Sequence, residues 1–295
     1  MKVAVVGTGA WGKAFAAALT RNRHEVTLVS RWESAVPSAT ELLFLAVPAQ
    51  AVRERLGHLA VPAGVPLVSL AKGIEIATGL RVTQVIADIL PGHPVGAVSG
   101  PGLAGEVAAG KPTVLVVAAS QPEVTETVQR VMHNTVLRTY RSGDLAGVEY
   151  GGALKNIFAI SAGVCSGLRI GENAMAGLVT RSLAEMVRIA VSGGARMETM
   201  FGLSGLGDLM LTAYSATSRN HRVGVGLGQG RGLEDILANL GGVAEGVFTC
   251  QAIHAYCAQR GIKAPIVGET FRVLFEGKSP SSAMRDLLTR DAYEE

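Results

Sequence analysis

Short apolar runs separated by segments of helical periodicity fill the first half of the chain. Residues 3–6 form the first run and lack polar alternation, which is typical of a strand buried on both faces of a sheet. Further strands are predicted at residues 25–30, 42–47, 66–69, 95–98, 113–118 and 137–140. Helices are predicted at residues 10–20, 49–59, 78–90, 104–109 and 122–132. This alternation predicts an α/β fold of the Rossmann-like type, a doubly wound parallel sheet.

The pattern changes after residue 142, where helical periodicity continues and no strand of comparable quality follows. Helices are predicted at residues 144–167, 173–192, 204–214, 233–239, 249–260, 265–275 and 281–288. We therefore expect a dinucleotide-binding α/β domain over residues 1–142 and an all-α substrate domain over residues 143–295.

The connection between the second and third predicted strands is short. Residues 31–41 contain Pro37 and two serines and show no helical period. Because a parallel crossover usually takes a dozen or more residues, commonly with a helix, this segment is predicted to be a bare loop. The sheet is therefore expected to be shortened after its second strand.

The first strand leads into the sequence GTGAWG at residues 7–12. A strand, GxGxxG and a helix in that order form the dinucleotide-binding fingerprint. Gly7 permits the tight turn, Gly9 lets the backbone approach a pyrophosphate, and Gly12 lets helix and strand pack closely. The second strand ends at Arg31, which favours NADP, although Glu33 keeps NAD open.

A single lysine, Lys155, interrupts the apolar run GGALKNIFAI at residues 151–160. Its helical neighbours are glycines and alanines, which suggests room for another molecule over the ammonium. The simpler reading of this stretch alone is a lysine whose stem covers apolar surface while its ammonium reaches water.

Other candidate groups lie far from Lys155 in the sequence. Lys72 ends a predicted strand, and Asp208 and Thr212 share one helical face. Residues 218–220 (SRN) add a polar cluster. Lysine, arginine and short polar donors suit a substrate with a phosphate and a hydroxyl or carbonyl. Burial lowers a lysine's pKa, so that it can exchange a proton with a carbinol near neutral pH.

Composition narrows the classes of function. The 295 residues are 48% hydrophobic and 17% charged, with a net charge of +3, which supports a sizeable core and gives no case for nucleic-acid binding. Three cysteines without a CxxC pair and six histidines without ligand spacing predict no metal site and a reducing cytoplasm. No apolar run reaches the length of a membrane span. The apolar second half favours a homodimer.

Taken together, the motifs resemble the bacterial NAD(P)-dependent glycerol-3-phosphate dehydrogenase family, within the wider 6-phosphogluconate-dehydrogenase-like fold. The matching segments cover nearly the whole chain in the family's order. They are GTGAWG (7–12), AVPAQAVRE (46–54), SLAKGIE (69–75), SGPGLAGEVAAGKPT (99–113), GVEYGGALKNIFAI (147–160), GLSGLGDLMLT (202–212), SRN (218–220) and VAEGVFT (243–249).

The resemblance implies a role for each matching residue. Lys155 is expected to accept a proton from glycerol 3-phosphate and to return it to dihydroxyacetone phosphate, and Lys72, Asp208 and Thr212 are expected to share this reaction centre. The residues expected to bind substrate are Lys72, Gly100, Gly102, Lys155, Asn156, Asp208, Ser218, Arg219 and Asn220. The residues expected to bind the dinucleotide are Gly7, Gly9, Ala10, Trp11, Gly12, Arg31, Lys72, Ala104, Arg219, Val243 and Glu245.

Two departures from the family pattern affect these expectations. Gly102 stands where the family usually has a serine, so one side-chain contact to substrate is expected to be absent or moved to the backbone. Family members also carry a helix, a strand and further helical residues where this chain has only residues 31–41. We expect a sheet with one strand fewer at that edge, a more open adenine site and weaker cofactor binding.

The resemblance predicts an enzyme that supplies glycerol 3-phosphate for phospholipid synthesis. Two alternatives remain open from the sequence. One is another small dehydrogenase of the same fold, of the ketopantoate or hydroxyacid reductase type. The other is a non-catalytic nucleotide-binding protein, which the shortened first domain makes plausible.

Overall fold

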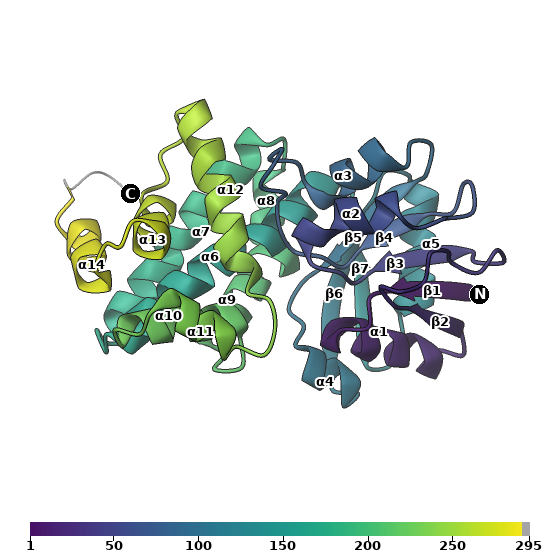
Figure 1. The fold of residues 1–295 in the computed structure, drawn as a ribbon, viewed down its shortest axis with the longest axis horizontal. Helices are drawn as coiled ribbons and strands as arrows, with labels where there is room; N and C mark the ends of the chain where they lie inside the picture. The colour runs from purple at the N-terminus through teal and green to yellow at the C-terminus, as the bar shows by residue number, and fades with distance from the viewer. Residues whose placement is uncertain (291–295) are drawn as a thin grey trace.

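The computed structural model describes residues 1–290, in which an α/β half and a helical half lie side by side (Figure 1). The strands are β1 (Lys2–Val6), β2 (Glu25–Val29), β3 (Leu42–Leu45), β4 (Leu67–Ser69), β5 (Val95–Ser99), β6 (Thr113–Ala119) and β7 (Leu137–Arg141). The helices among them are α1 (Ala10–Arg21), η1 (Ala49–Ala51), α2 (Val52–Gly57), α3 (Val82–Ile89), α4 (Ala104–Ala108) and α5 (Pro122–Met132). Every strand predicted from the apolar pattern is present.

The seven strands form one sheet in the order β2-β1-β3-β4-β5-β6-β7. Strands β1 to β5 are parallel, so their carboxyl ends meet at one edge. The strand order reverses direction between β1 and β3, and ligands of doubly wound sheets bind at such a switch point. Apolar clusters cover both faces of the sheet, as the unbroken apolar runs predict.

One strand pair differs from the predicted parallel arrangement. β6 runs antiparallel to β5, with Ser99 opposite Val116. The connection contains only the five-residue helix α4, so the chain does not travel back along the sheet. β6 therefore enters at the end where β5 leaves, and the longer helix α5 then returns the chain to a parallel β7.

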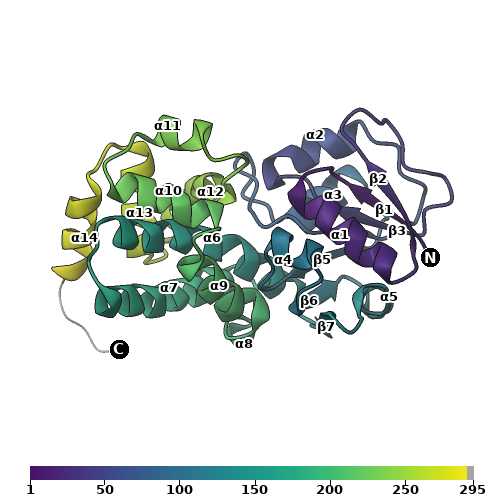
Figure 2. The same ribbon diagram turned by 90° about the horizontal axis from the view of Figure 1, so that it is seen from below.

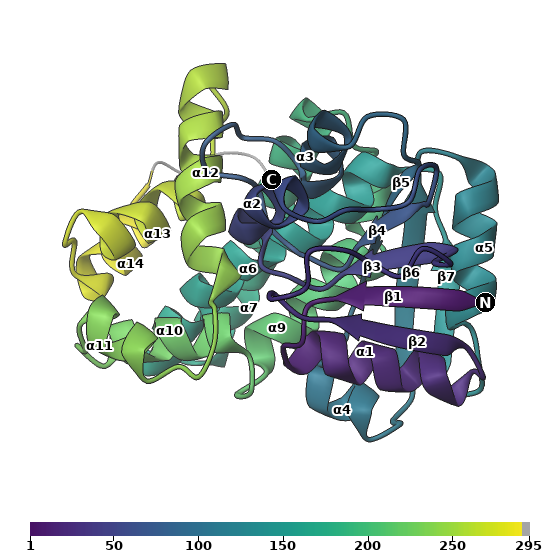
Figure 3. The ribbon, with the colours of Figure 1, turned by 45° about the vertical axis from the view of Figure 1, so that its right-hand side comes forward.

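The short connection after β2 is a loop, as predicted. Residues 30–41 contain neither a helix nor a strand, and Ala35 forms one isolated bridge to Ala60. β2 is therefore the edge strand on this side and is partly exposed, with α1 lying beside it (Figure 3). No strand of residues 1–290 pairs with its outer edge.

The helical half follows β7 directly. Its helices are α6 (Leu145–Gly167), α7 (Glu172–Ser192), α8 (Met197–Met200), the π-helical turn η2 (Leu203–Gly207), α9 (Asp208–Tyr214), α10 (Arg219–Gly228), α11 (Leu233–Ala238), α12 (Glu245–Arg260), α13 (Pro265–Phe275) and α14 (Pro280–Leu288). Neither α8 nor α10 was predicted. α3 begins four residues later than predicted, because Gly79 has a φ of +71° and turns the chain before it.

Helix α6 connects the two halves. Asp144 caps its first turn by accepting a hydrogen bond from Gly147 N at 2.8 Å. The helix packs against α7, α9, α10 and α12 and also reaches β5 and β6 (Figure 2). Side chains on α6 therefore lie either in the helical core or at the seam with the sheet. No helix of residues 1–290 is long and apolar enough to cross a membrane.

Candidate active site

The glycine-rich turn after β1 has the geometry that its pattern predicts. Gly7 has a φ of +117°, and a side chain there would meet the Ala46 carbonyl. A Cβ at Gly12 would lie 2.0 Å from the Gly7 carbonyl oxygen, whereas one at Gly9 would face open space. Among residues 1–290, no side chain caps the α1 N-terminus. Its backbone N–H groups are therefore available to an anion such as a pyrophosphate.

A cluster of buried charges lies at the seam, where Lys155 of α6 meets Asp208 of α9 and Lys72 from the loop after β4. Lys155 Nζ lies 3.0 Å from Asp208 Oδ1, and Lys72 Nζ lies 2.6 Å from Asp208 Oδ2. Lys155 Nζ also donates to Thr212 Oγ1 at 2.7 Å, and Lys72 Nζ donates to the Gly100 carbonyl at 2.8 Å. The structure therefore joins five of the predicted residues in one network.

Burial decides the protonation chemistry of this cluster. It lowers the pKa of Lys155 to about 8; Asp208 opposes this shift, and the ammonium of Lys72 adds to it. Burial alone would raise the pKa of Asp208, but the two lysine ammoniums outweigh it and hold that pKa below its usual value. Lys155 can therefore gain and lose a proton near neutral pH beside a carboxylate that stays ionised.

The glycines around Lys155 allow close approach of neighbouring backbone, which differs from the expected space for a ligand. A Cβ at Gly151 would lie 2.6 Å from the Ser204 carbonyl oxygen, and one at Gly163 would lie 2.1 Å from the His221 carbonyl oxygen. Backbone from η2 and α10 occupies those positions, so the expectation that the stripe leaves room for a ligand is wrong there. The reading of Lys155 as a lysine that reaches water is also wrong, because the residue is only 7% exposed.

Two asparagines connect four segments beside the reaction centre. Asn156 Nδ2 donates to the Lys72 carbonyl at 3.0 Å, and Asn220 Nδ2 donates to Asn156 Oδ1 at 2.8 Å. Asn220 Oδ1 in turn accepts from Gly246 N at 3.0 Å. This chain ties the Lys72 loop to α6, α10 and the start of α12. Both side chains are buried and engaged with protein, which favours positioning of Lys72 over direct contact with substrate.

The other cleft residues lie around this core. Ser218 caps α10 by accepting from His221 N, and the exposed Arg219 follows it. The charge of Arg219 lowers the pKa of both Lys155 and Glu245, so its guanidinium lies near both. Glu245 Oε1 accepts from Ala49 N across the seam at 3.1 Å, and burial raises its pKa to about 7.

Trp11 of the glycine-rich turn lies against Gly102 in the loop after β5. A Cβ at Gly102 would lie 3.0 Å from Trp11 Cη2, so a side chain there would press on the indole.

Arg31 lies at the end of β2. In the strand order of the sheet, β2 is three strands away from β4, which carries the Lys72 loop at its end. Arg31 and Trp32 are both exposed, and the guanidinium lies 4.3 Å from the indole centroid. Ala104 begins α4, and Val243 is partly exposed before α12.

Two polar side chains at the seam were not predicted. Ser99 Oγ is buried, has no hydrogen-bond partner in the described part of the chain, and would meet a Cβ at Gly152 at 2.4 Å. Thr249 Oγ1 and Glu245 Oε2 are buried beside Gly73 and likewise have no partner there. Ser99 opens the SGPG segment at a strand end, which was the available signal. Thr249 lies four residues after Glu245, and no sequence signal pointed to it.

The site as a whole defines a class of protein. An uncapped helix N-terminus at the switch point of a doubly wound sheet suits a dinucleotide, and the seam with the helical half holds a buried lysine able to exchange a proton. This is the arrangement of a nicotinamide-dependent dehydrogenase. Within residues 1–290, no group of histidine, cysteine, aspartate or glutamate side chains could hold a metal ion.

Comparison with known proteins gives the family. The model for the C-terminus of NAD-dependent glycerol-3-phosphate dehydrogenase matches residues 144–285, and the model for its N-terminus matches residues 2–38 and 33–125. A relative from Thiobacillus denitrificans, glycerol-3-phosphate dehydrogenase [NAD(P)+], is 41% identical over the full length of both chains. The chain belongs to the NAD-dependent glycerol-3-phosphate dehydrogenase family.

Solved structures agree with this assignment. A crystal structure of glycerol-3-phosphate dehydrogenase from Coxiella burnetii has a TM-score of 0.92 and 31% identity, and covers 98% of this chain and 99% of that chain. A ketopantoate reductase from Ralstonia eutropha reaches a TM-score of 0.60 at 14% identity, covers 96% of this chain and 99% of that chain, and shares the fold alone.

The comparisons also locate the shortened segment. The alignment with the Thiobacillus relative spans 328 positions, against 295 residues in this chain, so the relative has residues that this chain lacks. The N-terminal family model matches in two pieces that meet at residues 33–38, inside the short connection after β2. The departure predicted from the sequence therefore falls where the match to the family is broken.

Proposed function

We propose that this protein interconverts sn-glycerol 3-phosphate and dihydroxyacetone phosphate with a nicotinamide dinucleotide, using Lys155 as the group that carries the substrate proton. The observation that supports this most strongly is the buried Lys155–Asp208–Lys72 cluster. Two cations beside one carboxylate leave a surplus positive charge for an anionic substrate. We place the boundary between the dinucleotide-binding and helical domains at residues 142–143.

The residues of the site divide the work between them. Neutral Lys155 accepts the hydroxyl proton when glycerol 3-phosphate is oxidised, and protonated Lys155 returns it to the carbonyl oxygen in the reverse direction. Asp208 and Thr212 hold its Nζ in place. Arg219 and Lys72 attract the phosphate, with Ser218, Gly100 and Gly102 lining the path to it. Asn156 and Asn220 hold the Lys72 loop.

The dinucleotide is assigned to the carboxyl edge of the sheet. Gly7, Gly9, Ala10 and Gly12 cradle its pyrophosphate at the start of α1. Trp11 and Ala104 flank it, and Val243 and Glu245 close it from the helical half. When bound, the cofactor supplies or accepts the hydride.

The test of this function is oxidation of NADPH or NADH with dihydroxyacetone phosphate by the wild type and by Lys155→Ala. We expect turnover in the wild type and a loss of about 10³-fold in kcat in the variant, within the range for general acid–base groups. A wild type without turnover contradicts the function. Equal turnover in both proteins contradicts only the role of Lys155.

We infer a preference for NADP from the loop after β2. The Glu33 carboxylate accepts from Ser30 N and Oγ, and Arg55 donates to the Glu33 carbonyl at 2.8 Å, so Glu33 is used inside the loop. Arg31 remains exposed to meet a 2′-phosphate. Steady-state kinetics should show a lower KM for NADPH than for NADH. Arg31→Gln should raise only the KM for NADPH.

We also expect the missing segment after β2 to weaken cofactor binding, because it leaves the adenosine end of the site open. Calorimetric titration with NADPH tests this, and affinity equal to that of a full-length relative contradicts it.

We further infer a cytoplasmic homodimer that supplies glycerol 3-phosphate for phospholipid synthesis. Three buried free cysteines support the reducing compartment. Exposed Phe201, Met210 and Tyr214 support a dimer interface, which light scattering tests.

A further inference from the structure

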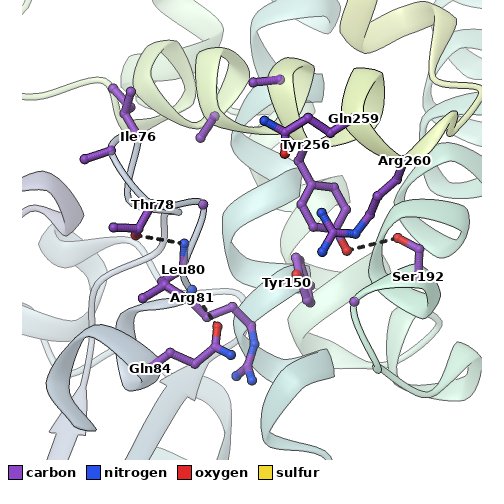
Figure 4. Close-up of a pocket in the computed structure, with 15 residues that line it drawn as sticks. Ile76, Thr78, Leu80, Arg81, Gln84, Tyr150, Ser192, Tyr256, Gln259 and Arg260 are labelled. Carbon is purple, nitrogen blue, oxygen red and sulfur yellow. Dashed lines mark hydrogen bonds between the residues drawn. The ribbon is translucent and has the colours of Figure 1, made fainter. Parts of the chain in front are cut away.

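A cavity of about 390 Å³ lies across the seam between the two halves, apart from the reaction centre (Figure 4). The α/β half contributes residues 76–81 and Gln84, and the helical half contributes Tyr150, Ser192 and the last turns of α12. Its volume falls in the range of about 300–1,000 Å³ that small-molecule sites occupy.

The charge of this cavity is positive. Its lining includes Arg81 and Arg260 and no aspartate or glutamate. Arg81 is already committed, because its Nη1 pairs with the buried carboxylate of Glu149. Arg260 is exposed, stacks 4.1 Å from the Tyr256 ring centroid, and forms no ion pair with any carboxylate of residues 1–290. The Arg260 guanidinium is therefore a cation held against the Tyr256 ring, with no anionic partner in the described part of the chain.

Neutral polar groups and small apolar side chains complete the lining. Gln259 and Gln84 offer side-chain amides, and the hydroxyl groups of Ser192 and Tyr256 lie 3.2 Å apart (Figure 4). Alanines of α12 and the side chain of Ile76 provide apolar surface between them. This lining suits a molecule with one anionic group and a compact apolar or aromatic body.

The cavity and the reaction centre lie on different faces of α6. Tyr150 precedes Lys155 by five residues, which places the two side chains about 140° apart around the helix axis. Tyr150 points to the end of α7, where a Cβ at Gly193 would lie 2.4 Å from its ring. Lys155 points to α9. None of the lysines, Asp208 or Arg219 lines the cavity.

Two segments nevertheless take part in both the cavity and the active site. The loop that carries Lys72 continues directly into the cavity wall at Ile76. Helix α12 starts at Glu245, which accepts from Ala49 N across the seam, and ends in the cavity at Arg260. A molecule that contacts both segments therefore affects the parts of the chain that position the dinucleotide and Lys72.

We propose that this cavity is a second ligand site, which binds a small organic anion with a phosphoryl or carboxylate group through Arg260. The bound anion bridges the residues 76–81 loop and α12 and fixes the two halves relative to each other. Its occupancy changes the KM for the cofactor and does not compete with dihydroxyacetone phosphate.

Calorimetric titration with phenyl phosphate and with benzoate tests the proposal, and variants of Arg260 and Ala255 separate binding in the cavity from binding at the reaction centre. We expect the wild type to bind at least one probe, and the stronger binder shows whether the site takes a phosphoryl group or a carboxylate. Arg260→Gln should weaken binding by about tenfold or more, as expected for a lost charge-assisted hydrogen bond. Ala255→Trp should also abolish it, because the indole fills the cavity while Arg260 stays.

Arg138→Gln is the matched control. Arg138 also stacks on a tyrosine, Tyr140, with 5.0 Å between guanidinium and centroid, but it lines no part of the cavity. This variant should bind the probes as the wild type does, and the melting temperatures of all three variants report folding. The proposal is overturned if neither probe binds the wild type at up to about 10 mM. It is also overturned if Arg260→Gln binds unchanged, or if inhibition by the probe is competitive with dihydroxyacetone phosphate.

Discussion

Two faces of helix α6 each hold a buried carboxylate interaction, and they differ in the balance of charge. On the face of Lys155, two ammoniums share the single carboxylate of Asp208. On the side of α6 that meets Arg81, beside Tyr150, the carboxylate of Glu149 pairs with this one cation and also accepts hydrogen bonds from Thr83 N and Oγ1 at 2.8 and 2.5 Å. The first cluster has a positive charge to spare, whereas the second is fully satisfied within the protein.

The balance of charge decides how each buried group is used. A surplus cation in a desolvated place attracts an anion, so it serves chemistry. A carboxylate whose oxygens both accept hydrogen bonds within the protein joins segments of the chain. Glu149 of α6 does so by accepting a hydrogen bond from Thr83 N, in the first turn of α3. Changing one group on each face should therefore separate catalysis from stability.

The largest effect is expected from Asp208→Asn on the Lys155 face. The neutral amide no longer offsets the two ammoniums, so the pKa of Lys155 falls further and its Nζ loses an anchor. We expect kcat for dihydroxyacetone phosphate reduction to fall by about 10³-fold, within the span of about 10²–10⁴ for proton-transfer groups. Steady-state kinetics measure it. A loss below tenfold contradicts the comparison.

Glu149→Gln on the Tyr150 face should act on stability. It leaves Arg81, whose side chain is 15% exposed, without its carboxylate partner. Breaking such a buried pair costs about 3 kcal/mol of unfolding free energy. Urea unfolding measures this cost, while kcat at saturating substrate should change little. A fall in kcat as large as that in Asp208→Asn would show that Glu149 also serves the reaction.

Gly224→Ala tests the packing that holds the Lys155 face. A Cβ at Gly224 of α10 would lie 1.9 Å from the Ile160 carbonyl oxygen of α6. Because this neighbour is a backbone atom, it cannot move aside by a change of rotamer. We expect a loss of about 1–3 kcal/mol of unfolding free energy. Gly177→Ala in α7 is the control, because a Cβ there meets nothing within 4 Å. It should raise stability by about 0.5–1 kcal/mol.

The pH dependence of the reaction tests the charge balance without any substitution. The pKa of Lys155 is about 8. Oxidation of glycerol 3-phosphate requires the neutral amine, so its kcat/KM should rise about tenfold per pH unit below that value and level off above it. Reduction requires the ammonium and should show the opposite trend. A profile for Glu149→Gln that matches the wild type would confirm that the two faces are independent.

Most of the fold could be predicted from the sequence. Apolar runs located all seven strands, and the helical period located α6 and α7 to within a residue at each end. The bare loop after β2 followed from the length and composition of residues 31–41. The glycine-rich turn was predicted from the order of strand, GxGxxG and helix, and the structure gives Gly7 and Gly12 a steric reason to be glycine.

Helix α10 shows why the rest could not be predicted. Its sequence RNHRVGVGLG holds three glycines, which oppose helix formation in isolation. In the structure, Gly224 and Gly228 face Gly163 and Gly167 of α6, and the backbones meet at a distance that side chains would forbid. Tertiary packing therefore outweighs local propensity. The same contacts overturn the idea that the small residues around Lys155 leave space for a ligand.

The residue types of the site, the order of the elements and the family can all be read from the amino-acid sequence. The folded structure was needed to show which groups share charge, because Lys72, Lys155 and Asp208 are far apart in the chain and meet at the seam. It also decided that Arg260 has no carboxylate partner in residues 1–290 while Arg81 has one. Proton affinity and anion binding depend on burial and on distances between charges, and folding sets both.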